Sequence, residues 1–146
     1  MSKIMNKTSQ LLLVAVLALS GIFFYFFFEK MANPIITTVL ALILTYFSIW
    51  IIYSMSQWIL KIVKRSDVKK KTELLNTMLI ISIISFLLLF SSFVIDWNET
   101  LLTIVSDLTT ALGYFYFASQ VEKTTPKIAT IYSLSIILLQ SLFFMF

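Results

Sequence analysis

The chain has 146 residues, of which 60% are hydrophobic and only 12% are charged, and its formal net charge is +4. Soluble domains are roughly 45–50% apolar, so this composition excludes an ordinary water-soluble domain. The chain has no Cys and no His. Disulfides, thiolate metal sites, cysteine nucleophiles and imidazole acid-base chemistry are therefore excluded, and we expect no cofactor and no metal.

Long apolar stretches follow one another along the whole chain. A hydrocarbon core about 30 Å thick is crossed by roughly 20 residues of apolar helix. Five stretches meet this length: residues 11–28, 34–60, 74–95, 100–119 and 126–146. The sequence predicts an all-α, polytopic integral membrane protein, in which residues 1–146 form one membrane domain, a bundle of about five transmembrane helices. Asn33-Pro34 and Thr125-Pro126 predict the starts of the second and fifth helices, as cap and first-turn proline.

The segments between the apolar stretches differ in charge. Cations predominate before residue 11, in residues 61–73 and in residues 122–127. Residues 29–30 contain one acid and one cation, and the only charged residues in 96–99 are acids. Cytoplasmic segments are enriched in Lys and Arg. This alternation predicts a multi-pass protein of the cytoplasmic membrane with its N-terminus in the cytoplasm and its C-terminus outside.

The largest group of cations lies in the second of these segments and consists of Lys61, Lys64, Arg65, Lys69, Lys70 and Lys71. Two explanations fit it: contact with anionic lipid headgroups or an acidic cytoplasmic partner, and the orientation of the chain alone. Trp58 precedes the group and Trp97 lies at another boundary, both near predicted interfaces. Because the cations flank apolar spans, we expect no binding of nucleic acid.

Asp107 is the acid placed deepest in a predicted span, on the order of 10 Å along the helix from Thr100. An ionisable group costs at least about 2.5 kcal/mol in the bilayer, so it faces protein or water and often marks a binding site. At about 100° per residue it shares a stripe with other polar side chains. The predicted ligand or ion site is Asp107, Thr103, Thr110, Tyr114 and Ser106, with Asp96 and Glu99 as an outer acidic rim.

Two interpretations of Asp107 remain open. It is either a structural carboxyl, protonated, hydrogen-bonded by hydroxyls or paired with Lys30, or a site for a proton, a cation or a cationic ligand. Because residues 100–119 are the most polar stretch, an alternative with four spans, in which this helix is re-entrant, places the C-terminus in the cytoplasm.

Small and hydroxyl residues form stripes on other predicted helices. These stripes are typical of helix contacts, and we expect their hydroxyls to bond across the contact. They include Thr38, Thr45, Ser48, Ser56, Ser82, Ser85, Thr130 and Ser133.

The sequence contains no Gly-rich phosphate loop, nucleophile elbow or paired intramembrane carboxylates, so we expect no enzyme. The first functional prediction is a small bacterial, membrane-embedded interaction protein. It would be an immunity or self-protection protein against a bacteriocin or toxin, or an accessory subunit of a membrane complex. Its partners would be the lipid bilayer, another membrane protein or a peptide, and further copies of itself. The alternative is a small ion- or proton-coupled transporter or channel subunit that uses Asp107.

Overall fold

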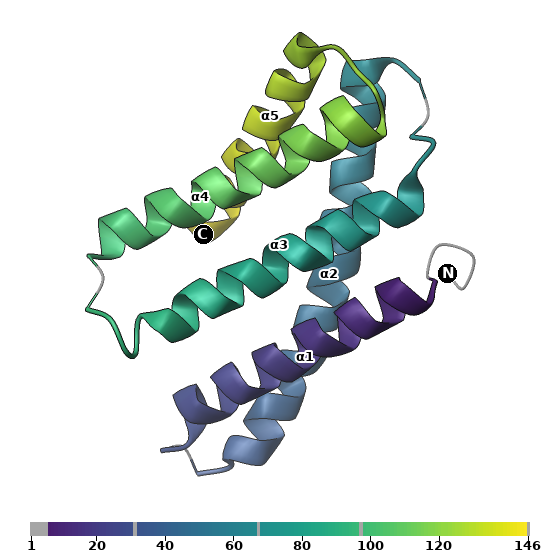
Figure 1. Cartoon of the computed structure of the whole chain (residues 1–146). Coiled ribbons are helices and arrows are strands. Elements are labelled where there is room, and N and C mark those ends of the chain that lie inside the picture. The colour runs from purple at the N-terminus through teal and green to yellow at the C-terminus, as the bar shows by residue number, and fades with distance from the viewer. Residues whose placement is uncertain (1–5, 31, 67, 97, 146) are drawn as a thin grey trace.

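The computed structural model describes residues 6–30, 32–66, 68–96 and 98–145, with side chains as far as Leu142 (Figure 1). Trp97, predicted at an interface, lies outside these residues. The described chain folds into α1 (Lys7–Phe28), α2 (Pro34–Lys64), α3 (Lys71–Ser91), α4 (Glu99–Tyr116), the π-helix η1 (Phe117–Val121) and α5 (Pro126–Met145).

The predicted all-α class is confirmed. Four helices are long and apolar enough to cross a membrane: α1, α2, α3, and α4 continued by η1. The fifth, α5, is also apolar, and its described side chains cover residues 126–142. The chain is therefore a helical membrane protein with four to five helices of spanning type.

Helix boundaries differ from the predicted ones where local caps decide them. Helix α1 begins at Lys7, four residues early, because the Asn6 side chain accepts a hydrogen bond from the Ser9 amide at 2.8 Å. Helix α3 covers residues 71–91 instead of 74–95, and residues 92–95 continue as a turn. Hydropathy marks what is apolar, whereas caps and turns decide what is helical.

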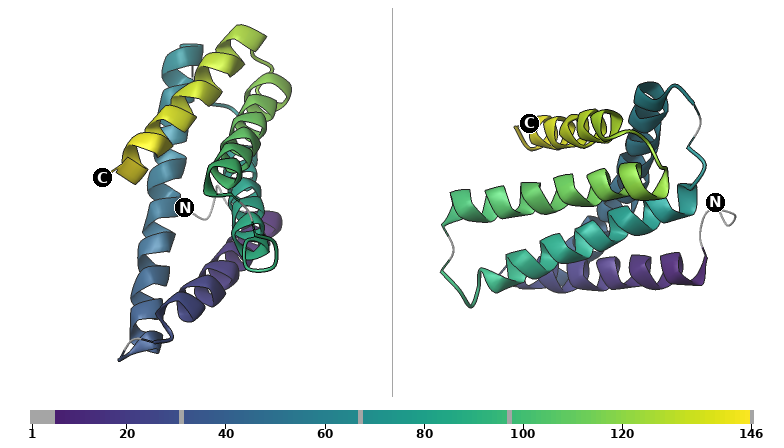
Figure 2. Two further views of the ribbon diagram at one scale, coloured as in Figure 1. Left: turned by 90° about the vertical axis from the view of Figure 1, so that its left-hand side faces the viewer. Right: turned by 45° about the horizontal axis from the view of Figure 1, so that its top comes forward.

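The helices form two layers (Figure 2). Helices α1, α3 and α4 lie side by side in one layer, and α2 and α5 cross behind it. Helix α2 has 31 residues, about 46 Å, which exceeds the roughly 30 Å of a hydrocarbon core. Its strong inclination to the other layer accommodates this length. As a result α2 packs against α1 along one part and against α5 along another.

Helices α1 and α3 are joined near both ends. Near the end of α1, the Phe23 ring lies 6.2 Å from the Phe86 ring and 6.1 Å from the Phe90 ring. Near its start, the Ser9 hydroxyl donates to the side-chain oxygen of Asn76. In lipid, apolar helices gain no hydrophobic energy by packing together. Aromatic contacts and a cross-helix hydrogen bond are two of the interactions that hold them together instead.

Most cations gather at one end of the bundle. The starts of α1, α3 and α5 and the ends of α2 and η1 lie on the same side (Figure 1), and we call this side the cationic end. The opposite end carries Glu29, Lys30, Asp96 and Glu99. This arrangement is the one that the alternating charges require, while the side of the membrane that each end faces stays a prediction.

Most of the predicted hydroxyl stripes do not bond across helices. The Thr38 hydroxyl donates to its own helix at the Pro34 carbonyl (2.6 Å), and Ser82 donates to Met78 (3.0 Å). The same pattern holds for Thr45, Ser48 and Thr130. The prediction was wrong for these side chains because a carbonyl one turn back is always within reach of a Ser or Thr hydroxyl.

Two helix ends place a non-glycine residue at positive φ, Arg65 at 61° and Lys123 at 55°. A residue with a Cβ atom is less stable in this region by roughly 1–2 kcal/mol, whereas glycine, which has no Cβ atom, adopts it freely.

We expect Lys123→Gly to raise the free energy of unfolding in detergent micelles by about 1 kcal/mol. Lys127→Gly, also exposed but inside the first turn of α5, should lower it by a similar amount. An equal decrease in the free energy of unfolding for Lys123→Gly and Lys127→Gly would show that positive φ at Lys123 carries no cost.

Candidate functional site

One face of α4 is apolar and the opposite face is polar. The helix is capped by Asn98, whose side chain accepts from the Thr100 amide at 2.9 Å. The apolar face is exposed and suits contact with lipid. It carries Leu101, Ile104, Leu108 and Leu112.

The polar face is divided into two parts along the helix. Thr110 and Tyr114, towards the cationic end, are 4% and 1% exposed. Asp107 and Ser106 are half-buried and Thr103 is exposed. The predicted ligand residues therefore share a stripe but do not share an environment.

Asp107 stands without a partner in the described chain. No hydrogen bond or ion pair joins its carboxylate to a described residue, and the neighbouring Thr103 and Thr110 hydroxyls donate instead to their own helix, to the Glu99 and Ser106 carbonyls. Lys30 is exposed and forms no ion pair with Asp107. The interpretation of Asp107 as a satisfied structural carboxyl therefore finds no support among these residues.

Of the two rim acids, Glu99 is the first residue of α4 and Asp96 lies three residues before it. Asp96 and Glu99 are both exposed. The open part of the α4 polar face, which we call the open α4 face, comprises Thr100, Thr103, Ser106 and Asp107. Together with the two rim acids it is an acidic, partly exposed surface that extends to the end opposite the cationic one.

The buried part of the polar face packs into a group of hydroxyls. The Tyr114 ring lies 5.7 Å from the Tyr132 ring of α5 and is perpendicular to it. Ser56 of α2 is fully buried beside both tyrosine hydroxyls. Within the described chain, no hydrogen bond of good geometry reaches the Ser56 or Tyr132 hydroxyl. Tyr114, predicted as a ligand residue, is therefore a core residue that joins three helices.

The best-connected charge of the described chain is Glu122, whose side chain is 1% exposed. One carboxylate oxygen accepts from Lys64 Nζ at 3.1 Å and from the Lys69 amide at 3.0 Å, and the other accepts from the Lys70 amide at 3.0 Å. These amides belong to Lys69 and to the N-cap residue Lys70, directly before α3, where the helix dipole favours an anion. Glu122 thus joins the end of α2, the start of α3 and the loop before α5.

The π-helix sets the position of Glu122. The Glu122 amide donates to the Phe117 carbonyl, five residues back, and the Thr124 amide donates to the Ala118 carbonyl. Phe117 and Ala118 are fully buried. The widened turn brings the chain back over the start of α3 and directs the carboxylate inward. Sequence reasoning missed this role and took Glu122 as a loop charge opposing Lys123 and Lys127.

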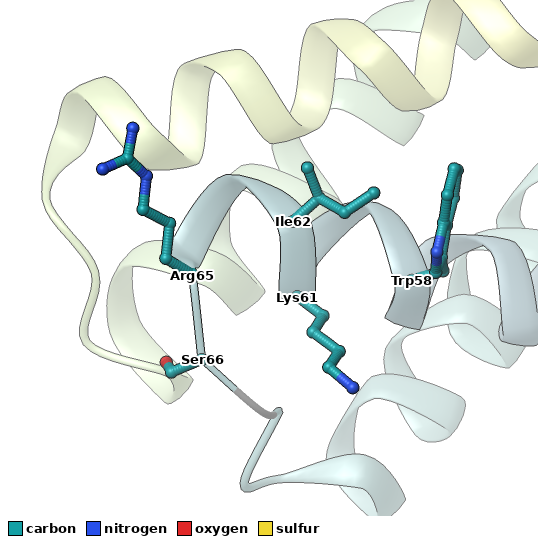
Figure 3. Close-up of a pocket in the computed structure, with 5 residues that line it drawn as sticks. All are labelled: Trp58, Lys61, Ile62, Arg65 and Ser66. Carbon is teal, nitrogen blue, oxygen red and sulfur yellow. The ribbon is translucent and has the colours of Figure 1, made fainter.

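Of the predicted group of six cations, Lys64 forms an ion pair with Glu122, and the other five differ from it in exposure. Lys64 is half-buried, whereas Lys61, Arg65, Lys69, Lys70 and Lys71 have exposed side chains. At the end of α2, a hollow of about 470 Å³ is lined by Trp58, Lys61, Ile62, Arg65 and Ser66 (Figure 3). A second hollow, of about 420 Å³, lies on α1 beside Lys7 and Gln10.

Within the described ranges, no three metal-ligating side chains lie close enough to hold an ion. Comparison of the chain with protein-family models, with curated proteins and with solved structures finds no match in any of the three.

Proposed function

We propose that this chain is a non-enzymatic, membrane-embedded interaction protein, and that the open α4 face is its docking surface. One observation carries the proposal: Asp107 lies in a spanning helix, half-exposed, with no partner among the described residues. A carboxyl at this depth costs at least about 2.5 kcal/mol unless protein or water faces it. A partner that supplies a hydrogen-bond donor or a cation removes that cost.

The charge of the surface favours a cationic occupant. Asp96 and Glu99 lie at the end of the bundle towards which the open α4 face extends from Asp107, and Lys30 is the one cation that the sequence places at this end. An acidic surface attracts positively charged groups and accelerates the association of a cationic partner. The occupant we propose is a membrane-inserted basic peptide, or a helix of another membrane protein with a basic side chain. An immunity protein against a cationic bacteriocin or toxin, or an accessory subunit of a membrane complex, fits this surface.

The alternative, an ion- or proton-coupled transporter or channel subunit, requires a route beyond Asp107. Towards the cationic end the same face is closed by Thr110, Tyr114 and Phe117, which are at most 4% exposed. This closure favours docking over transport.

Site-specific photocrosslinking in membranes of the native host tests the proposal. A photoreactive residue at position 103, on the open α4 face, should form a protein crosslink. The matched probe at position 112, on the lipid-facing side, should not. Asp107→Leu should reduce the crosslink at position 103 at least about tenfold without reducing membrane insertion or the free energy of unfolding, because Leu is preferred in a span.

Four outcomes oppose the proposal. Equal crosslinking at positions 103 and 112, or an unchanged crosslink in Asp107→Leu, removes the docking surface. A large loss of stability in Asp107→Leu assigns a structural role to the carboxyl. Proton or cation flux by the purified chain in liposomes, abolished by Asp107→Asn, establishes transport instead.

A further inference from the structure

The hollow at the end of α2 combines an apolar wall with two cations. Trp58 and Ile62 are 63% and 54% exposed, and Lys61 and Arg65 line the same hollow (Figure 3). The side chains of Arg65, Ile62 and Trp58 project to the same side of the helix end, while Lys61 points away from them. Ser66 adds a hydroxyl at the rim.

The position of the hollow matches a membrane boundary. It lies where the apolar helix α2 gives way to a charged loop, and tryptophan is enriched at this level of a bilayer. An indole and an aliphatic side chain pack against the glycerol and upper acyl region of a lipid, whereas cations at this boundary lie at the level of the phosphate.

Arg65 is available to a phosphate. Lys64, the next residue, is already bound to Glu122. The left-handed conformation at Arg65 ends α2, and within the described chain no acid pairs with its guanidinium. A guanidinium binds phosphate oxygens in a bidentate manner.

We propose that this hollow is a binding site for the headgroup of an anionic phospholipid in the leaflet at the cationic end. Arg65 binds the phosphate, Ser66 adds a hydroxyl at its rim, and Trp58 packs on the glycerol region. Lys61, which lines the hollow but points away from Arg65, adds only the charge of a second nearby cation. The remaining exposed cations, Lys69 and Lys71 among them, contribute only the general attraction of a basic loop. The site is separate from the open α4 face, at the other end of the bundle.

Native mass spectrometry of the purified chain in mild detergent tests the site, with phosphatidylglycerol and phosphatidylcholine as the probes. The wild type should retain phosphatidylglycerol in preference to phosphatidylcholine. The double variant Lys61→Gln/Arg65→Gln should weaken phosphatidylglycerol binding at least about tenfold. The matched control Lys69→Gln/Lys71→Gln loses the same charge outside the hollow and should weaken binding by less than about twofold. Both variants should keep the helicity and elution volume of the wild type.

Trp58→Leu provides a second variant, since the exposed ring contributes little to the fold. It should weaken retention of phosphatidylglycerol several-fold with all cations in place. Equal losses in the two double variants, equal retention of both lipids, or no effect of Trp58→Leu would overturn the site. Displacement of the lipid by millimolar inorganic phosphate would show a site for free phosphate instead.

Discussion

Replacing Glu122 with alanine should lower the free energy of unfolding by about 3–5 kcal/mol, the cost of removing one member of a buried ion pair. The substitution leaves the Lys64 ammonium, whose side chain is 14% exposed, without its carboxylate, and deprives the Lys69 and Lys70 amides of their acceptor. Each orphaned amide adds a desolvation penalty. Reversible unfolding in mixed micelles, followed by helical circular dichroism, measures the change.

Three further variants separate the contributions. Glu122→Gln keeps one oxygen for an amide, so we expect a loss of about half that of Glu122→Ala. Glu99→Ala removes an exposed carboxylate from the first turn of α4 and should cost no more than about 1 kcal/mol. In a double-mutant cycle, Lys64→Ala and Glu122→Ala should couple strongly, because the second change removes the charge that the first leaves unpaired. Additive effects in that cycle would contradict a buried pair.

The role of Glu122 could not be predicted from the sequence because it depends on contacts over more than fifty residues. Its amide partners belong to the two residues directly before α3, and only the packing of the η1 turn over the start of that helix brings them together. One signal was present: Glu122 is the first of three charged residues in residues 122–127, and the other two are cations. An isolated acid in a basic loop is an anomaly that a charge count alone does not explain.

The spanning helices were predictable because the bilayer imposes a length and an apolar composition on each of them. The start of α2 at Pro34 agrees with its proline signal. The cap predicted there is partly wrong, since Asn33 occupies the cap position without a side-chain hydrogen bond. At α5 the Thr125 hydroxyl does accept from the Ile128 amide, at 3.4 Å.

The α4 stripe was predicted as one polar face, and its division into buried and open parts was not. Sequence periodicity gives the direction of each side chain around the helix axis but not which neighbour covers it. Tyr114 is covered because α2 and α5 converge there on Ser56 and Tyr132. Asp107, two turns away, meets no such convergence. The same periodic signal thus produced a core residue and a candidate docking residue.

The close packing of α3 and α4, which determines where the open α4 face lies, depends on Gly113. A Cβ atom at this residue would lie 2.5 Å from Cδ1 and 2.7 Å from Cγ1 of Ile81, which is 7% exposed. We expect Gly113→Ala to lower the free energy of unfolding by about 1–3 kcal/mol through overpacking, and Gly113→Leu to lower it further. Ile81→Ala alone should cost about 2–5 kcal/mol through the cavity it leaves.

The double variant Gly113→Ala/Ile81→Ala should be more stable than the sum of its single changes predicts, by at least about 1 kcal/mol, because the added methyl then fills vacated space. The chain's other glycine provides the matched control. A Cβ atom at Gly21 would meet Leu42 at an ordinary 3.6 Å. Gly21→Ala should therefore raise stability by up to about 1 kcal/mol through helix propensity. The same micelle unfolding measures all five variants, and a Gly113→Ala variant as stable as Gly21→Ala would show that Gly113 does not limit the approach of α3 and α4.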